Sequence, residues 1–248
     1  MESMPDHGEG IVKVLAINAT YRPKQTTSQL TQSALNGAAS LGAQTEMVLL
    51  QELDIQYCRN CLTCYQDLES DIAPCSIADD ARGVLEKIKQ ADGVILASPV
   101  HSGFVTGLMT AFIERACFTM VRPTGRMLGM QGCPEPRLID KARAVATIVS
   151  AGMIPPELRQ YCDLGTPWLL EAAALIANGS PVGDMYACGL FPRQLKNEEW
   201  SKAFLLRELT AGQLQEAFDL GVKMATAIRD GQVKPYDPAA FLPPGLGA

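Results

Sequence analysis

The stretch that decides the fold is Ile11–Ile17, IVKVLAI. This run is short and rich in β-branched residues, which is typical of a strand buried on both faces of a parallel sheet. A polar loop comes next over Asn18–Thr27, and Ser28–Leu41 then carries small and apolar residues at helical spacing up to Gly42. A buried strand, a loop and a helix in this order form the repeating unit of an α/β protein.

The same alternation continues along the chain. Further strands are expected over residues 45–50, 93–97, 142–150 and 182–190, and further helices over about 80–90, 106–119, 168–178 and 213–230. Five strands that alternate with helices predict one parallel sheet covered on both faces, an α/β fold in the flavodoxin-like doubly wound order 2-1-3-4-5. In such a sheet the ligand lies outside the carboxyl ends of the strands, at the switch point beside the first strand. That rule selects the loops after Ile17, Ala97 and Ser150.

The domain organisation follows from the same pattern. We expect a single domain over residues 1–233, because the sequence shows no internal repeat and no linker. Two segments interrupt the alternation: a cysteine-rich insertion at 58–75, after the second strand, and an excursion at 119–140 rich in Gly, Pro and Met. The Pro- and Gly-rich residues 234–248 predict an extended C-terminal tail.

Composition limits the classes of partner. Hydrophobic residues make up 47% of the 248 residues and charged residues 19%, which is enough to build a large core. The net charge of −6 argues against nucleic acid and anionic membranes as main partners, because both are negatively charged and bind basic surfaces. No apolar run has the length of a membrane span, and Met1–Gly10, which contains His7, lacks the basic and apolar regions of a secretory signal. A cytoplasmic location is therefore expected.

The loop after Ile17 is rich in hydroxyl groups and contains one arginine. It lacks both the GxGxxG dinucleotide fingerprint and the GxxxxGK[ST] phosphate loop. Hydroxyls, backbone N–H groups and a helix N-terminus together suit a single phosphate monoester, to which Arg22 can donate a charge-assisted hydrogen bond. The alternative is a solvated loop in which Thr27 or Ser28 only caps the helix.

The stretch Val14–Leu30 resembles the start of the NADPH-dependent FMN reductase-like branch of the flavodoxin superfamily. Members of that branch show a Ser-Pro-Arg-like turn and a Gly-Asn-Thr-like helix start, where this chain has Thr20-Tyr21-Arg22 and Gln25-Thr26-Thr27. Arg22 and Thr27 match and Thr20 is a conservative difference, whereas Tyr21 and Gln25 do not match. The resemblance implies that the cofactor is FMN and that its phosphate lies among Thr20, Arg22, Thr27 and Ser28.

The loop after residue 97 extends the resemblance. Members usually show Ser-Pro-Val-Tyr there and an Asp-Arg-like pair further along the next helix, where this chain has Ser98–His101 and Glu114-Arg115. A small turn after the fourth strand also matches. By this resemblance the residues beside the flavin ring are Pro99, Val100, His101, Ser102, Gly103, Phe104, Ser150 and Gly152. His101 either tunes the flavin electrostatically or only fills the space of the usual aromatic side chain, and Phe104 packs on the ring or on a partner subunit.

Eight cysteines occur in the chain, and four of them form the pattern Cys58-x2-Cys61-x2-Cys64-x10-Cys75. Two-residue gaps let a chain wrap around a cubane cluster and present several thiolates to it. The pattern resembles the iron–sulfur flavoprotein family, whose members carry FMN and a [4Fe-4S] cluster and form homodimers or larger homo-oligomers. The ten-residue gap before Cys75 departs from the shorter gap of that family. A zinc site and a relict motif without metal remain alternatives, whereas disulfides are not expected in a cytosolic chain. The four cysteines outside the pattern are expected to be core residues or thiols without a function, namely Cys117, Cys133, Cys162 and Cys188.

These observations predict an FMN-dependent oxidoreductase, a flavoprotein that uses its [4Fe-4S] cluster in electron transport. The donor is NAD(P)H or a redox partner such as ferredoxin, and the chain is expected to form a homodimer or homotetramer that brings one subunit's cluster near another's flavin. No side chain is assigned a catalytic role. The alternatives are an NAD(P)H-dependent FMN, quinone or nitro reductase without a cluster, and a non-enzymatic interaction module that binds zinc.

Overall fold

The computed structural model describes residues 10–242, and its centre is a five-stranded parallel sheet. The strands are arranged in the order β2-β1-β3-β6-β7, and all four neighbouring pairs are parallel. Their bounds are β1 Lys13–Asn18, β2 Gln44–Leu49, β3 Gly93–Pro99, β6 Arg143–Gly152 and β7 Gly179–Gly189. The predicted doubly wound order is therefore confirmed, with β6 and β7 as the fourth and fifth strands.

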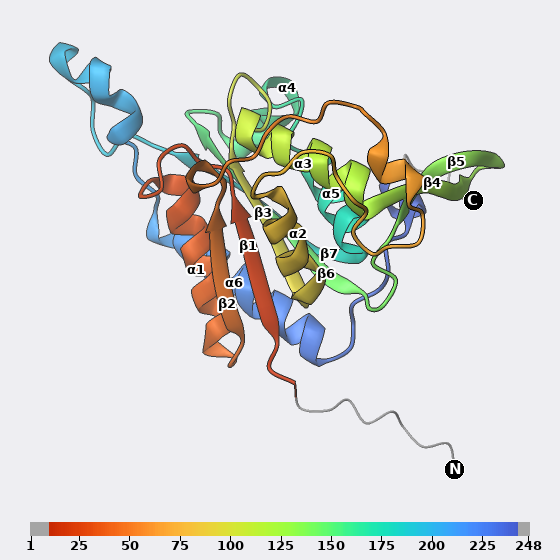
Figure 1. Ribbon diagram of the computed structural model, residues 1–248. Coiled ribbons are helices and arrows are strands. Elements are labelled where there is room, and N and C mark those ends of the chain that lie inside the picture. The colour runs from red at the N-terminus through yellow and green to blue at the C-terminus, as the bar shows by residue number, and fades with distance from the viewer. Residues whose placement is uncertain (1–9, 243–248) are drawn as a thin grey trace.

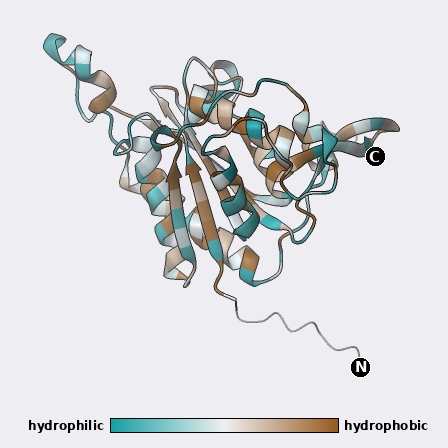
Figure 2. Cartoon of the chain, viewed as in Figure 1, coloured by the Kyte–Doolittle hydropathy of each residue, from teal (hydrophilic) through white to brown (hydrophobic). Residues whose placement is uncertain are grey.

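Helices cover both faces of this sheet (Figure 1). One face carries α1 (Thr26–Ser40) and α6 (Ala211–Arg229). The other carries α2 (Ala81–Gln90), α3 (Gly107–Met120) and α5 (Trp168–Ala177). The central strands are apolar along most of their length because both of their faces are buried, and Figure 2 shows this as brown strands between helices with teal outer faces.

Two glycines allow α1 and α6 to pack in direct backbone contact. A Cβ atom on Gly37 would lie 1.9 Å from the carbonyl oxygen of Phe218, and one on Gly221 would lie 1.7 Å from that of Ala34. Any larger residue at either position would push the helices apart. This contact determines where the N-terminus of α1 lies relative to the ends of the strands.

The excursion at 119–140 is an antiparallel hairpin, which the sequence did not predict. It consists of β4 (Val121–Met127) and β5 (Met130–Pro136), and it projects from the body at the right of Figure 1. Leu128 and Gly129 connect the strands with φ angles of 50° and 78°, as a tight hairpin turn requires. The prolines of this segment are compatible with the hairpin, because a two-stranded ribbon tolerates proline wherever the missing N–H would face outward.

Short helical turns make up most of the remaining chain. They are η1 (Leu50–Glu52), η2 (Thr63–Gln66), η3 (Pro156–Leu158), α4 (Arg159–Cys162), η4 (Asn197–Leu205) and η5 (Pro238–Phe241). The segment expected as an extended tail is described to residue 242, where Tyr236 donates its backbone N–H to Asn178 Oδ1 (3.1 Å). His7 and residues 243–248 lie outside the described chain. Over residues 10–242, no helix is both long and apolar enough to cross a membrane.

Candidate functional site

The loop after β1 is organised by Asn18, the last residue of that strand. Its Nδ2 atom donates to Ser28 Oγ (3.2 Å) and Thr31 Oγ1 (3.3 Å), and its Oδ1 atom accepts from the Thr20 backbone N–H (3.0 Å). The Thr20 hydroxyl in turn accepts from the Arg22 backbone N–H (3.2 Å). Thr20 and Ser28 are both buried, so these two predicted residues shape the loop from inside.

The first turn of α1 meets the end of β6. The hydroxyls of Thr27 and Ser150 are hydrogen-bonded at 2.7 Å, which brings together two predicted residues that are 123 positions apart. Within the described chain, the side chain of Gln25, the N-cap residue of α1, forms no capping hydrogen bond, and the first turn of α1 contains no acidic residue. The free N–H groups and the positive end of the helix dipole therefore favour an anion at this position, as a flavin phosphate requires.

The loop after β3 is tied to both of its neighbours. The Val100 backbone N–H donates to the Ser150 carbonyl (2.8 Å), and the Thr106 hydroxyl donates to the Ala19 carbonyl (2.9 Å). Thr106 also donates its backbone N–H to Ser98 Oγ (3.1 Å). The three loops that the sequence selected thus meet at one edge of the sheet.

A tight turn follows β3 at this edge. His101 and Phe104 exchange backbone hydrogen bonds of 2.8 and 3.0 Å, and the two residues between them have positive φ angles, 53° at Ser102 and 80° at Gly103. The Gly103 carbonyl accepts from two backbone N–H groups, those of Leu164 (2.9 Å) and of residue 165 (3.0 Å). The segment before α5 therefore supports the turn from its other side and leaves the aromatic ring of Phe104 half exposed.

His101 stacks on Tyr21, the residue that differs from the family pattern in the first loop. The ring centroids are 5.5 Å apart and the planes are inclined by 26°. Desolvation lowers the pKa of His101 below its ordinary value, and the positive charge of Arg22 lowers it further. The imidazole is therefore mainly neutral at pH 7, and it fills an aromatic position next to the first loop.

The four cysteines of the predicted cluster motif line one small pocket. All eight cysteines of the chain lie in its described part and are free thiols. Asn60 and Leu62 have φ angles of 48° and 58°, so the backbone turns sharply at both gaps between the first three cysteines. Among residues 10–242, no three His, Cys, Asp or Glu side chains are grouped so that they could hold a metal ion.

The ten-residue gap does not keep Cys75 away from this pocket. Its neighbour Ser76 is hydrogen-bonded through Oγ to Cys61 Sγ at 3.1 Å, and the Ala73 backbone N–H donates to the Thr119 carbonyl at 2.8 Å. The hydrogen bonds of Ser76 and Thr63 lower the pKa of Cys61 to about 7. A thiol of this kind is readily present as the thiolate that binds metals.

Two buried arginines hold the cysteine segment against the body. Arg137 donates to the Cys64 carbonyl (3.1 Å), and Arg115 donates to the Gln56 carbonyl (3.0 Å). Arg115 also forms a bidentate ion pair with Asp79 in which both side chains are almost fully buried. Both arginines therefore fix the cysteine segment through its backbone carbonyls, whereas burial raises the pKa of the Cys64 thiol.

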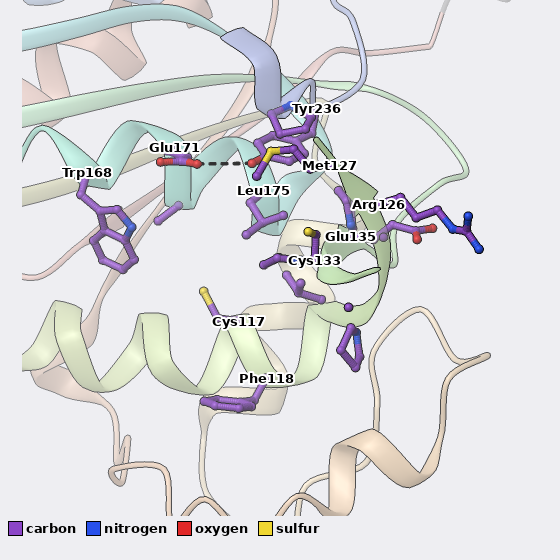
Figure 3. A pocket seen from close by; sticks show the side chains of 18 of the residues that line it. Cys117, Phe118, Arg126, Met127, Cys133, Glu135, Trp168, Glu171, Leu175 and Tyr236 are labelled. Carbon is purple, nitrogen blue, oxygen red and sulfur yellow. Dashed lines mark hydrogen bonds between the residues drawn. The ribbon is translucent and has the colours of Figure 1, made fainter. Parts of the chain in front are cut away.

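A cavity of about 660 Å³ lies between the hairpin, α3, α5 and the C-terminal segment, next to the cysteine pocket, with which it shares Phe118 (Figure 3). Tyr236 donates to Glu171 across one wall at 3.4 Å, and burial followed by the charge of Glu171 raises the pKa of Tyr236 to about 12. Burial also raises the pKa of the Cys117 thiol in the opposite wall to about 12, so this thiol stays protonated. None of the predicted flavin or cluster residues lines this cavity.

The structure thus gathers the predicted residues at two places that α3 connects. Its N-cap Thr106 belongs to the flavin edge, and Phe118 and Thr119 near its other end line the cysteine pocket. Sequence reasoning missed Asn18, Thr106 and Arg137. Asn18 was detectable as a polar residue at the carboxyl end of a buried strand, whereas nothing in the sequence linked Arg137 to the cysteines.

Residues 12–154 match the protein family described as NADPH-dependent FMN reductase. An iron-sulfur flavoprotein of Methanocaldococcus jannaschii is 34% identical over 105 residues, which cover 42% of this chain and 52% of that protein. An iron-sulfur flavoprotein of Archaeoglobus fulgidus is 27% identical over 220 residues, which cover 88% of this chain and 86% of that one. The match therefore spans about half the length of the first relative and most of the second.

Two solved structures share the fold. A flavone reductase superposes with a TM-score of 0.55 at 20% identity, over 89% of this chain and 64% of that one. An azoreductase from Bacillus anthracis gives a TM-score of 0.55 at 12% identity, over 86% of this chain and 100% of that one. At these identities the likeness establishes a common fold and says nothing about substrates.

Proposed function

Because this chain belongs to the NADPH-dependent FMN reductase family, we propose that it is an FMN-dependent oxidoreductase that also binds a [4Fe-4S] cluster. Its donor is NAD(P)H or a reduced ferredoxin. FMN supplies a ring that exchanges hydrides or single electrons, and the cluster supplies single-electron transfer. The protein's part is to bind, orient and separate these two groups.

The flavin part of the proposal is supported by the edge where the three loops meet. The uncapped N-terminus of α1 and the Thr27–Ser150 pair suit the phosphate, and Arg22 adds a positive charge. Thr20 and Ser28 belong to the same proposed phosphate site, because their hydroxyl oxygens accept hydrogen bonds within the loop and an accepted bond does not use the hydroxyl proton. The ring is expected against the residues after β3 and β6, namely Pro99, Val100, His101, Ser102, Gly103, Phe104 and Gly152.

The observation that carries the cluster part is the pocket that Cys58, Cys61, Cys64 and Cys75 share. Zinc with four thiolate ligands at about 2.3 Å would need the four sulfurs in close contact. In the described chain the thiols line one pocket but are not grouped so that they could hold a single metal ion. The cluster is proposed from the number and spacing of the four cysteines, which suit a cubane. The names of the two archaeal relatives agree with this assignment.

Anaerobic purification with quantification of flavin, iron, sulfide and zinc tests the proposal. We expect FMN together with iron and acid-labile sulfide in equal amounts. Cys61→Ser should lose iron and sulfide and keep FMN. The matched control Cys133→Ser removes a thiol that does not line the cysteine pocket, so it should keep all three.

Two results would contradict the cluster. Anaerobic protein that contains zinc in place of iron would identify a zinc site. Protein with FMN and no iron, whose NADPH-driven quinone reduction is unchanged in Cys61→Ser, would identify a reductase without a cluster. Protein that binds no flavin at all would refute the proposed oxidoreductase.

A further inference from the structure

An arm of the chain rises beside the flavin edge. Residues 191–207 leave and rejoin the body at Leu190 and Glu208, whose backbones pair through hydrogen bonds of 3.1 and 2.8 Å. The arm contains η4 and is the light-blue segment at the upper left of Figure 1, on the side of the sheet where β1 ends. None of the residues in this arm was predicted from the sequence to bind a cofactor.

Arg207, the last residue of this arm, lies over the ends of β6 and β7. A Cβ atom on Gly152 would lie 1.4 Å from Arg207 Nη1, so the guanidinium rests directly on the Gly152 backbone. A Cβ atom on Gly189 would lie 3.4 Å from Arg207 Cβ and 3.3 Å from Thr26 Cγ2. The side chain of Arg207 therefore begins beside the first residue of α1 and ends beside the predicted flavin loop.

Within the described chain, Arg207 has no negatively charged side chain as an ion-pair partner. Within residues 10–242 its Nε atom is buried without a hydrogen-bond partner, and no carboxylate lies within ion-pair distance. By contrast, Arg193 in the same arm forms a bidentate pair with Glu199. Desolvation lowers the pKa of Arg207 below its ordinary value. A guanidinium cannot lose its proton at physiological pH, so a partly buried one without an anion is costly.

Arg22 brings a second positive charge to the same place. The guanidinium carbons of Arg22 and Arg207 lie 5.5 and 4.8 Å from the centroid of the Phe204 ring, and Arg22 Nη1 donates to the Phe204 carbonyl (3.1 Å). Phe191 flanks Arg207 at 5.3 Å. Two cations held together by aromatic contacts, at a helix N-terminus without acidic residues, form a site for a doubly charged anion.

We infer that Arg207 is a second arginine for the phosphate of FMN, held by Phe191 and by the Phe204 ring that Arg22 also contacts. This inference rests on the proposed FMN site and adds a residue to it. The phosphate monoester is the part of FMN that riboflavin lacks. Arg207 is therefore expected to strengthen the binding of FMN but not the binding of riboflavin.

The test compares the affinities of flavin-depleted full-length protein for FMN and for riboflavin, measured by flavin fluorescence. Arg207→Met keeps the length of the side chain and removes the charge. We expect it to raise the Kd for FMN at least tenfold and to leave the Kd for riboflavin unchanged. Arg207→Lys keeps a charge without the planar fork and should give a smaller increase. Lys202→Ala removes a positive charge from the same arm and is the control, with both affinities expected to stay as in the unmodified chain.

Three outcomes would overturn the inference. An unchanged Kd for FMN in Arg207→Met would show that no phosphate lies there. An equal loss for FMN and riboflavin would show that Arg207 only supports the fold. A rise in the KM for NADPH but not NADH, at unchanged FMN affinity, would assign the phosphate to the nicotinamide donor. An unmodified chain that binds neither flavin would instead contradict the proposed function.

Discussion

At the residue scale, the polar side chains buried in this protein serve mainly to hold loops in place. Asn18 arranges the first loop, and Asp79 with Arg115 fastens the cysteine segment to α3. Asp79 also accepts hydrogen bonds from the backbone N–H groups of Gln56 and Ala81. Burial raises the pKa of Asp79, but these donors outweigh it and the net pKa lies below the usual 3.8.

Asp79→Ala should therefore destabilise the protein strongly, because it leaves Arg115 buried without its partner. We expect a loss of about 3–5 kcal/mol in the free energy of unfolding, measured by urea denaturation. The exposed pair Arg82–Glu86 provides the control, and Glu86→Ala should cost less than about 1 kcal/mol. Equal losses in the two variants would contradict this assignment.

The same ion pair predicts a pH dependence. Because the folded-state pKa of Asp79 is lowered, its contribution is fully present above the unfolded value near 3.8 and is lost as the pH falls through the folded value. The stability difference between the unmodified chain and Asp79→Ala should therefore shrink below about pH 4. A difference that is constant down to pH 2 would show that folding does not lower the pKa of Asp79.

At the scale of elements, α3 connects the two candidate sites, and its N-cap determines how it meets the flavin edge. The Thr106 hydroxyl accepts from the Met109 backbone N–H (3.3 Å) and donates to the Ala19 carbonyl (2.9 Å). One side chain thus caps the helix and joins the loops after β1 and β3. The sequence predicted the helix from its apolar spacing but not this bond, because the partner of Thr106 is 87 residues away.

Thr106→Ala removes both hydrogen bonds at once. We expect a loss of about 1–2 kcal/mol in the free energy of unfolding, together with weaker FMN binding, because the first loop loses an anchor. Thr106→Ser keeps a hydroxyl at the same place and should restore most of both. Thr110→Ala, one turn along on the exposed side, should change stability by less than about 0.5 kcal/mol. If Thr106→Ser lost as much stability and FMN affinity as Thr106→Ala, the methyl group of Thr106 rather than its hydroxyl would be responsible.

At the scale of the whole molecule, the two candidate sites lie at different places along α3. Twelve residues separate Gly107 from Thr119, which corresponds to about 18 Å at about 1.5 Å per residue. Large apolar side chains are exposed beside both sites, namely Tyr57 and Leu62 in the cysteine segment and Phe104 in the flavin turn. Scattered exposed apolar groups are normal on a protein surface, so the oligomer in which one subunit's cluster approaches another's flavin is a prediction from the family resemblance.

Mixed oligomers test this arrangement. We expect the protein to sediment as a dimer or tetramer. Co-expression of a Cys61→Ser chain with an Arg22→Ala/Arg207→Ala chain should yield oligomers that transfer electrons from cluster to flavin, whereas either variant alone should not. A monomer in sedimentation with full electron transfer would contradict the arrangement.

The sequence by itself determined the sheet order, the three loops that meet at the carboxyl edge of the sheet and the spacing of four cysteines. These depend on local periodicity and short spacing, which a linear chain displays directly: the run Ile11–Ile17 predicts a strand, and residues 14–17 of it are buried in β1, although Ile11 is exposed ahead of the strand. The tertiary structure alone decided that residues 121–136 form a hairpin, that Cys75 reaches the other cysteines despite its long gap, and that Arg207 lies over Gly152. Each of these depends on contacts between residues far apart in the sequence, whose formation is governed by how the helices and strands pack rather than by any local pattern.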